Sequence, residues 1–225
     1  MNGKWLFCII CWCCLIAVNA QNTPQELYQN GGGDYLPLYN GKLEPGYLYG
    51  YLNTPYWPQE YTKGDIVFRN RKYKNVEMQL DCYRQGLLVL SNDRMRRIEV
   101  DGENVQFLEI GGMEYMWQDK KNGAPLSAYY SIINEGKEIV CRLHYATKPT
   151  KKIKDRQIVM EFDRREKLYL IKDGKWHELH GLASYIKLHK QQKEKLQRFC
   201  KEHQLLMKND TDWKLLASYC ETLFK

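Results

Sequence analysis

A hydrophobic period of two is the feature that most constrains how this 225-residue chain can fold. In residues 76–82, apolar side chains alternate with Glu77, Gln79 and Asp81, and the pattern returns in residues 97–100, 139–144 and 157–162. Alternation of this kind places one set of side chains in a core and the other in water. No segment of helical period separates these runs, so the chain lacks the helical crossover connections that neighbouring parallel strands usually need. The pattern predicts a sheet that is antiparallel throughout.

Turn signals lie between the alternating runs. Asp101-Gly102 and Asp173-Gly174 are hairpin signals, because both central residues of a type I′ turn need a positive φ. Polar connectors of hairpin length occupy residues 69–72, 84–86 and 134–137. Roughly ten to twelve short strands at this spacing indicate a mainly β domain over residues 35–180. The expected architecture is an antiparallel meander that forms a barrel or a two-sheet sandwich.

The period changes after Gly181. One helix face would carry Leu196, Phe199, Cys200 and His203, and a second would carry Trp213, Leu216, Ala217, Cys220, Leu223 and Phe224. Residues 209–211 offer N-capping oxygens before the second helix. We therefore expect a C-terminal two-helix hairpin over residues 181–225, packed on the β domain, so that the fold is α+β overall.

The N-terminus has the pattern of a secretory signal peptide over residues 1–20. Lys4 precedes an apolar run of 14 residues, and Val18 and Ala20 supply small residues before a cleavage point. A membrane anchor needs about 20 apolar residues, and a lipoprotein signal needs small residues before its cysteine, so both are weaker alternatives. Residues 21–34 are polar, contain three glycines and are expected to form a flexible leader. The prediction is an exported protein, periplasmic or envelope-associated, with no membrane span after cleavage.

The charge distribution bears on the class of partner. Lys4 lies in the expected signal peptide, so the totals of 34 Lys+Arg and 27 Asp+Glu become 33 and 27, a net charge of +6. This excess is spread along the chain and forms no basic block of the kind that binds nucleic acid. A nucleic-acid partner is therefore not expected.

Four of the eight cysteines lie within residues 1–20. The other four, Cys82, Cys141, Cys200 and Cys220, lie on apolar faces, where a cysteine behaves as a small hydrophobic residue. We expect buried free thiols, with a Cys200–Cys220 disulfide as the alternative, because antiparallel helices could bring the two together. None of the four belongs to a C-x-x-C pair, so neither redox chemistry nor a cysteine-rich zinc site is predicted.

Motifs of known chemistry are missing from the sequence, and no catalytic residue, metal or cofactor is predicted. Neither a G-x-S-x-G elbow nor a P-loop occurs. Residues 176–180, WHELH, are one residue short of H-E-x-x-H and follow a hairpin signal, where i and i+3 point to opposite faces. Asp81 and Glu161 are candidates for a glycosidase pair, but both are expected to be solvated residues on outer strand faces.

Tyrosine is unusually frequent, with 17 copies, and it gathers in residues 47–61. The candidate binding surface consists of Tyr47, Tyr49, Tyr51, Tyr56, Trp57 and Tyr61. The first three would share one face of an extended segment, and the others lie among prolines. Flat aromatic rings with a polar tip suit carbohydrate or peptide binding. The alternative is that these residues plug a barrel end or cover a sheet edge.

Two segments carry a resemblance to a group of proteins. Residues 61–91 have a hairpin pattern, and residues 184–206 form a lysine-rich helical tail. Both resemble uncharacterised exported β-rich proteins of Bacteroidota. The resemblance implies a periplasmic or envelope location and carries over no catalytic residues.

Three functional hypotheses follow. The first is a non-enzymatic exported β protein that binds or supports a cell-envelope component, whose partner would be an envelope protein or a glycan. The second is a glycan- or peptide-directed hydrolase with carboxylates from separate strands, which requires an outward Asp or Glu beside residues 47–61. The third is a barrel that carries a small apolar ligand, which requires a large apolar cavity.

Overall fold

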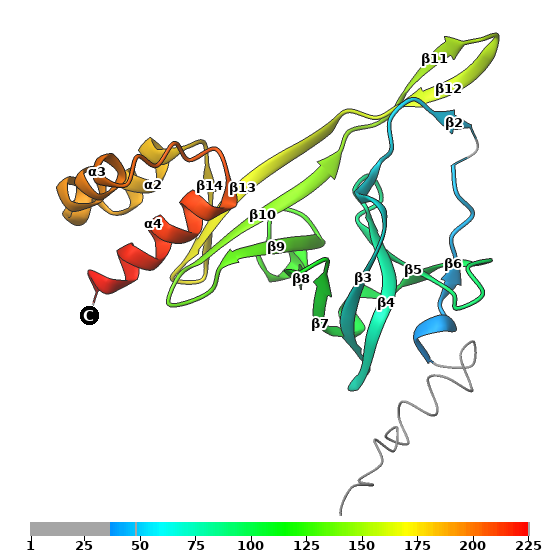
Figure 1. The fold of residues 1–225 in the computed structure, drawn as a ribbon, viewed down its shortest axis with the longest axis horizontal. Helices are drawn as coiled ribbons and strands as arrows, with labels where there is room; N and C mark the ends of the chain where they lie inside the picture. Colours follow the sequence, from blue (N-terminus) through cyan, green and yellow to red (C-terminus); the bar gives the residue numbers. More distant parts are fainter. Residues whose placement is uncertain (1–36, 48, 225) are drawn as a thin grey trace, which may run out of the picture.

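The computed structural model describes residues 37–47 and 49–224 (Figure 1). The signal peptide expected at residues 1–20 and the leader expected at 21–34 lie outside the described residues. Within the described residues the protein is mainly β, with one large antiparallel sheet and helices at the C-terminus, as predicted. The large sheet does not close into a barrel there, and the architecture is sandwich-like.

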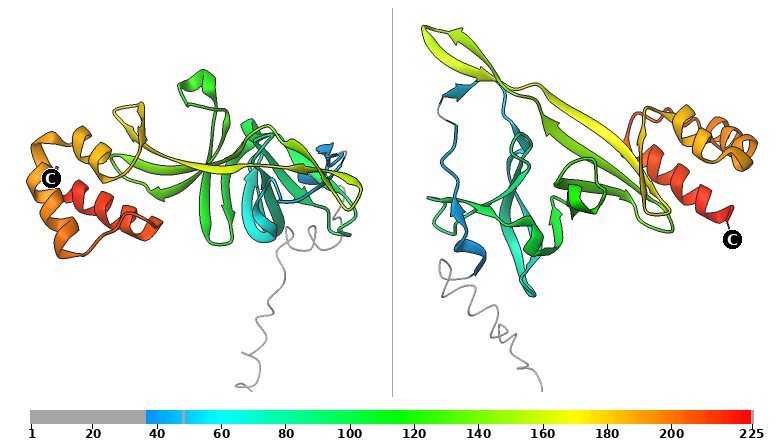
Figure 2. Two further views of the ribbon diagram at one scale, coloured as in Figure 1. Left: turned by 90° about the horizontal axis from the view of Figure 1, so that it is seen from above. Right: turned by 180° about the vertical axis from the view of Figure 1, so that it is seen from behind.

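The large sheet has eleven strands in the order β1-β6-β5-β4-β3-β7-β8-β9-β10-β13-β14. It curves strongly, and the long β10 and β13 strands extend from the helices to the opposite end of the molecule (Figures 1 and 2). Its strands are β1 (Lys42–Leu43), β3 (Tyr56–Phe68), β4 (Arg71–Asp81), β5 (Gly86–Leu90), β6 (Arg97–Val100), β7 (Val105–Ile110), β8 (Met113–Gln118), β9 (Ala128–Asn134), β10 (Ile139–Ala146), β13 (Arg164–Lys172) and β14 (Lys175–Leu179).

The strand order departs from a simple meander, because β1 pairs with β6 and β7 pairs with β3. Strands β3 to β6 pair in sequence, but β7 returns to pair with β3, with Gly64 opposite Ile110. The hairpin expected at Asp101-Gly102 is therefore wrong. Asp101 has a φ of −68°, and its side chain caps the short 3-10 helix η3 (Gly102–Asn104) by accepting from the Glu103 N–H. By contrast, Asp173 and Gly174 have φ values of 50° and 72° and join β13 to β14, which confirms the second hairpin signal.

A second, three-stranded sheet projects beyond the first (Figure 1). It contains β2 (Gly50–Tyr51), β11 (Thr150–Lys154) and β12 (Gln157–Glu161). Strand β2 runs parallel to β12, with Gly50 opposite Val159, so the expectation of antiparallel pairing throughout is wrong at this one pair. No tight turn joins these two strands, which lie about one hundred residues apart, so local turn geometry does not impose their direction.

The two largest hydrophobic cores of the described residues lie at the two ends of the large sheet. The first lies inside the curve of strands β3 to β8 and includes Ile66, Met78, Leu87 and Leu108, all fully buried. The 3-10 helix η2 (Pro37–Tyr39) adds Leu38 to it. The second core lies between one face of β9, β10, β13 and β14 and the C-terminal helices. The helices are therefore fastened to the half of the sheet that comes later in the chain.

The helical unit is larger than the predicted hairpin. The expected pair is α3 (Lys193–Glu202) and α4 (Asp210–Thr222), and it is preceded by α2 (Leu182–Leu188) and the 3-10 helix η5 (Lys190–Gln192). Helix α2 spans only seven residues, too few for a periodic pattern to stand out. Asn209 caps α4 as expected, because its side chain accepts from the Asp212 N–H at 2.8 Å. None of the described helices is long and apolar enough to span a membrane.

Candidate functional site

The tyrosine-rich segment packs where the two sheets meet. Tyr47 lies at the centre of an aromatic group, with ring centroids 6.5 Å from Tyr51, 6.1 Å from Tyr56 and 6.3 Å from Tyr83. Phe162 completes the group, 4.9 Å from Tyr47. We call these five residues the tyrosine cluster. Tyr83 and Phe162 were missed by the sequence reasoning, because they come from segments far from residues 47–61 and no local pattern links them.

The other predicted aromatic residues lie elsewhere. The Tyr49 ring lies beneath the ammonium group of Lys151 on β11, 5.1 Å away. Trp57 stacks on His144, with centroids 4.3 Å apart and an interplanar angle of 15°. The Tyr61 hydroxyl is buried without a hydrogen-bond partner among the described residues, and burial raises the pKa of Tyr61 to about 12. The structure thus brings three of the six predicted residues into one cluster.

Asp81 anchors the cluster from the end of β4. The Tyr47 hydroxyl lies 2.9 Å from Oδ1 and 2.8 Å from Oδ2 of Asp81, and the backbone N–H groups of Tyr83 and Arg84 donate to Oδ1. The Asp81 side chain is only 1% exposed, so the expectation of a solvated strand residue is wrong. Tyr47, from 34 residues earlier in the chain, covers this strand end, which the alternation in β4 could not reveal.

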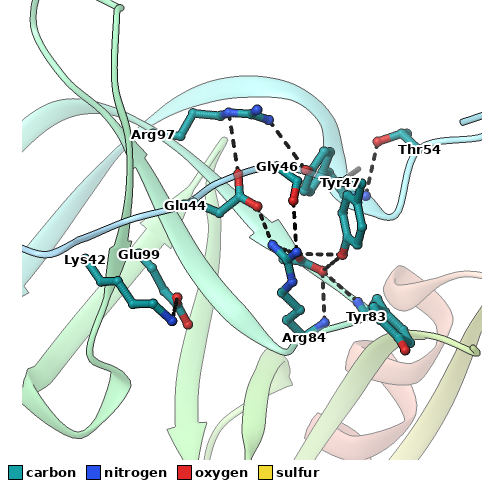
Figure 3. Close-up of polar contacts among 11 residues, drawn as sticks. Lys42, Glu44, Gly46, Tyr47, Thr54, Tyr83, Arg84, Arg97 and Glu99 are labelled. Carbon is teal, nitrogen blue, oxygen red and sulfur yellow. Dashed lines mark hydrogen bonds and ion pairs between the residues drawn. The ribbon is translucent and has the colours of Figure 1, made fainter. Parts of the chain in front are cut away.

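Glu44 is a second buried acid in the same place, and the sequence reasoning did not identify it. Its side chain, also 1% exposed, accepts from Arg84 Nη1 and pairs with Arg97, whose Nε lies 3.5 Å from Oε2 (Figure 3). Arg84 also donates to the Gly46 carbonyl at 3.0 Å and stacks over the Tyr47 ring at 4.4 Å. Two buried carboxylates and two arginines therefore balance one another, which is the condition under which burial of charge is tolerated.

The electrostatics of the cluster do not favour catalysis by its own side chains. Burial raises the pKa of Tyr47 and of Tyr56 far above the usual range, so both phenols stay protonated at neutral pH. Burial also raises the pKa of Asp81, although hydrogen bonds from Arg84, Tyr47 and Tyr83 act in the opposite direction. These groups bond mainly to one another, so the cluster acts as a rigid support.

The rim of the cluster is exposed and apolar. Tyr51, Leu52 and Tyr83 are each about two-fifths exposed, at 43%, 43% and 38%. The β11–β12 hairpin pairs with β2, the strand that carries Tyr51, and its own paired residues Ile153 and Ile158 are 82% and 48% exposed. We call these five side chains the exposed apolar rim. Individual exposed hydrophobic residues are common, but a set gathered on one projecting edge indicates an interaction surface.

Trp57 also lines a separate cavity of about 440 Å³ between the sheet and the start of α4. Polar side chains line part of its wall: Arg142 and His144 from β10, Glu166 from β13 and Asp210 from α4. Arg142 lies between the two acids, with Nη1 2.7 Å from Glu166 Oε2 and Nε 3.1 Å from Asp210 Oδ1. Carboxylates from separate elements do meet beside residues 47–61, as the hydrolase hypothesis requires.

The electrostatics of this cavity argue against acid catalysis by Glu166. His144 Nδ1 lies 3.2 Å from Glu166 Oε1. This hydrogen bond and the charge of Arg142 outweigh burial and lower the pKa of Glu166 to about 2. A glycosidase needs one carboxyl group with a raised pKa that can donate a proton. Glu166 has the opposite shift, so it does not fill that role.

The four cysteines of the described residues contribute neither a disulfide nor a reactive thiol to this end of the molecule. The structure has Cys82, Cys141, Cys200 and Cys220 as buried free thiols, so Cys200 and Cys220 are not joined. Burial raises the pKa of Cys82 to about 12, which keeps this thiol, next to Asp81, protonated. A group with metal-ligand chemistry lies instead beside the helical unit.

Comparison with protein families, curated proteins and solved structures finds no match to this chain.

Proposed function

We propose that this protein is an exported, non-enzymatic β protein that binds an anionic component of the cell envelope through the exposed apolar rim and the basic β11–β12 hairpin. The observation that carries the proposal is the pairing of exposed Ile153 and Ile158 on a hairpin rich in lysine. Export and envelope location rest on the pattern of residues 1–20 and on the resemblance of residues 61–91 and 184–206.

The charge of the hairpin supports an anionic partner. Residues 148–161 carry five basic side chains, Lys148, Lys151, Lys152, Lys154 and Arg156, against Asp155 and Glu161, so the segment has a net charge of +3. Basic residues near an anionic surface each contribute about 1 kcal/mol to binding. The two isoleucines add apolar area that leaves water on contact. A surface with both properties fits a partner whose negative groups border apolar material.

The tyrosine cluster supports binding by holding this surface rigid. Strand β2 carries Tyr51 and pairs with β12, and the Leu52 N–H donates to the Met160 carbonyl at 2.8 Å. Tyr47 and Asp81 fix the segment that leads into β2. A surface that is already ordered loses little conformational entropy when it binds.

Binding explains the structure better than the two alternatives. The hydrolase hypothesis requires a proton-donating carboxyl group that a substrate can reach. Arg142 and His144 keep Glu166 ionised, and Asp81, whose pKa is raised by burial, is only 1% exposed and is enclosed by Tyr47, Tyr83 and Arg84. The small-ligand hypothesis describes a barrel around a large apolar cavity, and the large sheet does not close into a barrel within the described residues.

The test is a sedimentation assay with three surfaces. The purified protein is mixed with vesicles of phosphatidylcholine alone, with vesicles containing phosphatidylglycerol, and with an insoluble acidic polysaccharide. We expect binding to one or both anionic surfaces and not to the neutral vesicles, and the two anionic arms distinguish a lipid headgroup from a glycan.

The variants Ile153→Ser and Lys154→Gln change the hairpin without touching either core, and both are expected to weaken this binding. Leu206→Ser is the matched control, because Leu206 is 71% exposed but lies between α3 and α4. Equal binding to all three surfaces, absence of binding to both anionic ones, or an equal loss in the control would contradict the proposal.

A further inference from the structure

Three side chains with metal-ligand chemistry meet where the helical unit joins the sheet. Glu138 directly precedes β10, His189 directly follows α2, and Cys220 lies near the end of α4. One ligand atom from each lies within 4.8 Å of the other two. His189 and Cys220 are almost fully buried, and the Glu138 side chain is 12% exposed. They are shielded from solvent and converge from three separate elements.

The histidine is oriented as a metal ligand would be. Its Nδ1 lies 2.9 Å from the Tyr185 carbonyl oxygen, which can only accept, so Nδ1 carries a hydrogen. Its Nε2 points to Glu138 Oε2 at 2.8 Å. Histidines that bind metals usually donate the other ring N–H to a carbonyl or carboxylate, which fixes the ring and the tautomer. Nε2 is therefore the nitrogen available for coordination.

The carboxylate is oriented in the same way. The Lys172 ammonium group on β13 donates a hydrogen bond to Glu138 Oε1, and the other carboxylate oxygen, Oε2, faces His189. Lys172 in turn lies over the Phe224 ring, 5.2 Å from its centroid. Each of these two ligands thus has a supporting contact of its own, as in metal sites with an ordered outer shell.

We propose that Glu138, His189 and Cys220 form a zinc site that fastens the helical unit to the sheet. A thiolate, an imidazole and a carboxylate are the three ligand types that Zn²⁺ accepts, and three protein ligands leave a fourth tetrahedral position for water. The chemistry excludes Ca²⁺ and Mg²⁺, which require oxygen ligands.

Zn²⁺ is coordinated by a neutral imidazole, a thiolate and a carboxylate, so binding at this site would require the Cys220 thiol to release its proton to solvent. Zinc affinity should therefore rise with pH.

The experiment measures metal binding by the purified full chain after treatment with a chelator. Titration with Zn²⁺ followed by calorimetry is expected to give one ion per chain and a higher melting temperature. Co²⁺ in place of Zn²⁺ is expected to give a cobalt–thiolate charge-transfer absorption. Cys220→Ser should abolish this absorption, and His189→Gln should weaken zinc binding by at least about 100-fold, since even outer-shell changes reach that size.

Two controls keep the result interpretable. Cys200→Ser removes another buried cysteine of the helical unit and should leave metal binding unchanged. His180→Gln removes an exposed histidine that lies 3.8 Å from Glu178, where metal could bind adventitiously. No zinc binding at micromolar concentration, absence of the thiolate absorption, or loss of binding in His180→Gln with retention in Cys220→Ser would overturn the proposal. Circular dichroism confirms that each variant is folded.

Discussion

The hydrogen bond between Tyr47 and Asp81 should contribute measurably to the stability of the whole β domain. The Tyr47 hydroxyl donates to a carboxylate that is almost fully buried, at distances of 2.9 and 2.8 Å to its two oxygens. The substitution Tyr47→Phe removes this donor and retains the ring, which packs 4.9 Å from Phe162. The variant therefore tests the hydrogen bond and leaves the aromatic packing in place.

The size of the effect follows from the charge of the acceptor. A hydrogen bond to an ionised group contributes about 1.5–3 kcal/mol, and a buried partner left without its donor keeps the cost of desolvation. Asp81 would retain the N–H groups of Tyr83 and Arg84, so we expect a loss of about 2 kcal/mol. For a chain of this size, that corresponds to a fall in melting temperature of roughly 4–8 °C.

Urea denaturation followed by tryptophan fluorescence measures the change. Tyr51→Phe is the matched control, because Tyr51 belongs to the same cluster but is 43% exposed, so water can replace any partner of its hydroxyl. We expect the control to change the unfolding free energy by less than about 0.5 kcal/mol.

The pH dependence gives a second readout. The Tyr47 hydrogen bond lowers the pKa of Asp81 against the effect of burial, so its removal raises that pKa further. The difference between the wild type and Tyr47→Phe should therefore be largest where Asp81 is ionised and should shrink as the pH falls. A Tyr47→Phe variant as stable as the control, or a difference that does not change with pH, would refute this account of the cluster.

Three further predictions concern the rest of the fold. Leu216→Asp places an unpaired charge at a fully buried position in the helical core, and it should lower the free energy of unfolding in urea by more than about 4 kcal/mol. Leu215→Asp, at the neighbouring position that is 41% exposed, should change this free energy little. The pKa of Glu166 is lowered from 4.5 to about 2, so its contribution to stability is present above pH 4.5 and is lost as the pH falls towards 2. Glu166→Gln should flatten the dependence of the unfolding free energy on pH in this range. An unchanged pH dependence would argue against the ion pair between Glu166 and Arg142. Gly64→Ala would place a Cβ 1.9 Å from the Glu109 carbonyl oxygen across the β3–β7 pair and should destabilise the protein by about 1–3 kcal/mol or more, whereas Gly50→Ala meets only Val159 at 3.9 Å and should be nearly neutral in thermal unfolding.

Local patterns predicted the elements that depend on neighbouring residues. The alternation of residues 97–100 matches the buried Ile98 and Val100 of β6, and the period after Gly181 matches the buried faces of α3 and α4. Asn209 was predicted as a cap because capping involves residues only three positions apart. In each case the interaction that decides the structure lies within one turn or one strand.

Local sequence patterns did not predict which polar residues of the candidate sites are buried. Asp81 alternates with apolar residues, yet it is buried because Tyr47 and Arg84 surround it. Glu44 has no sequence pattern at all, and its burial depends on the two arginines that it pairs with. Glu138, His189 and Cys220 follow no motif spacing, since three separate elements carry them.

By itself, the sequence determined that residues 64–180 form mainly antiparallel β strands, that the chain ends in amphipathic helices, and that familiar catalytic motifs are missing. The tertiary structure alone decided the return of β7 to β3, the parallel pairing of β2 with β12, and which polar residues are buried. The physical reason is the separation of interacting residues along the sequence, because periodicity and capping depend only on residues that are near one another in the chain. The partners of a buried charge are brought together only when distant segments pack.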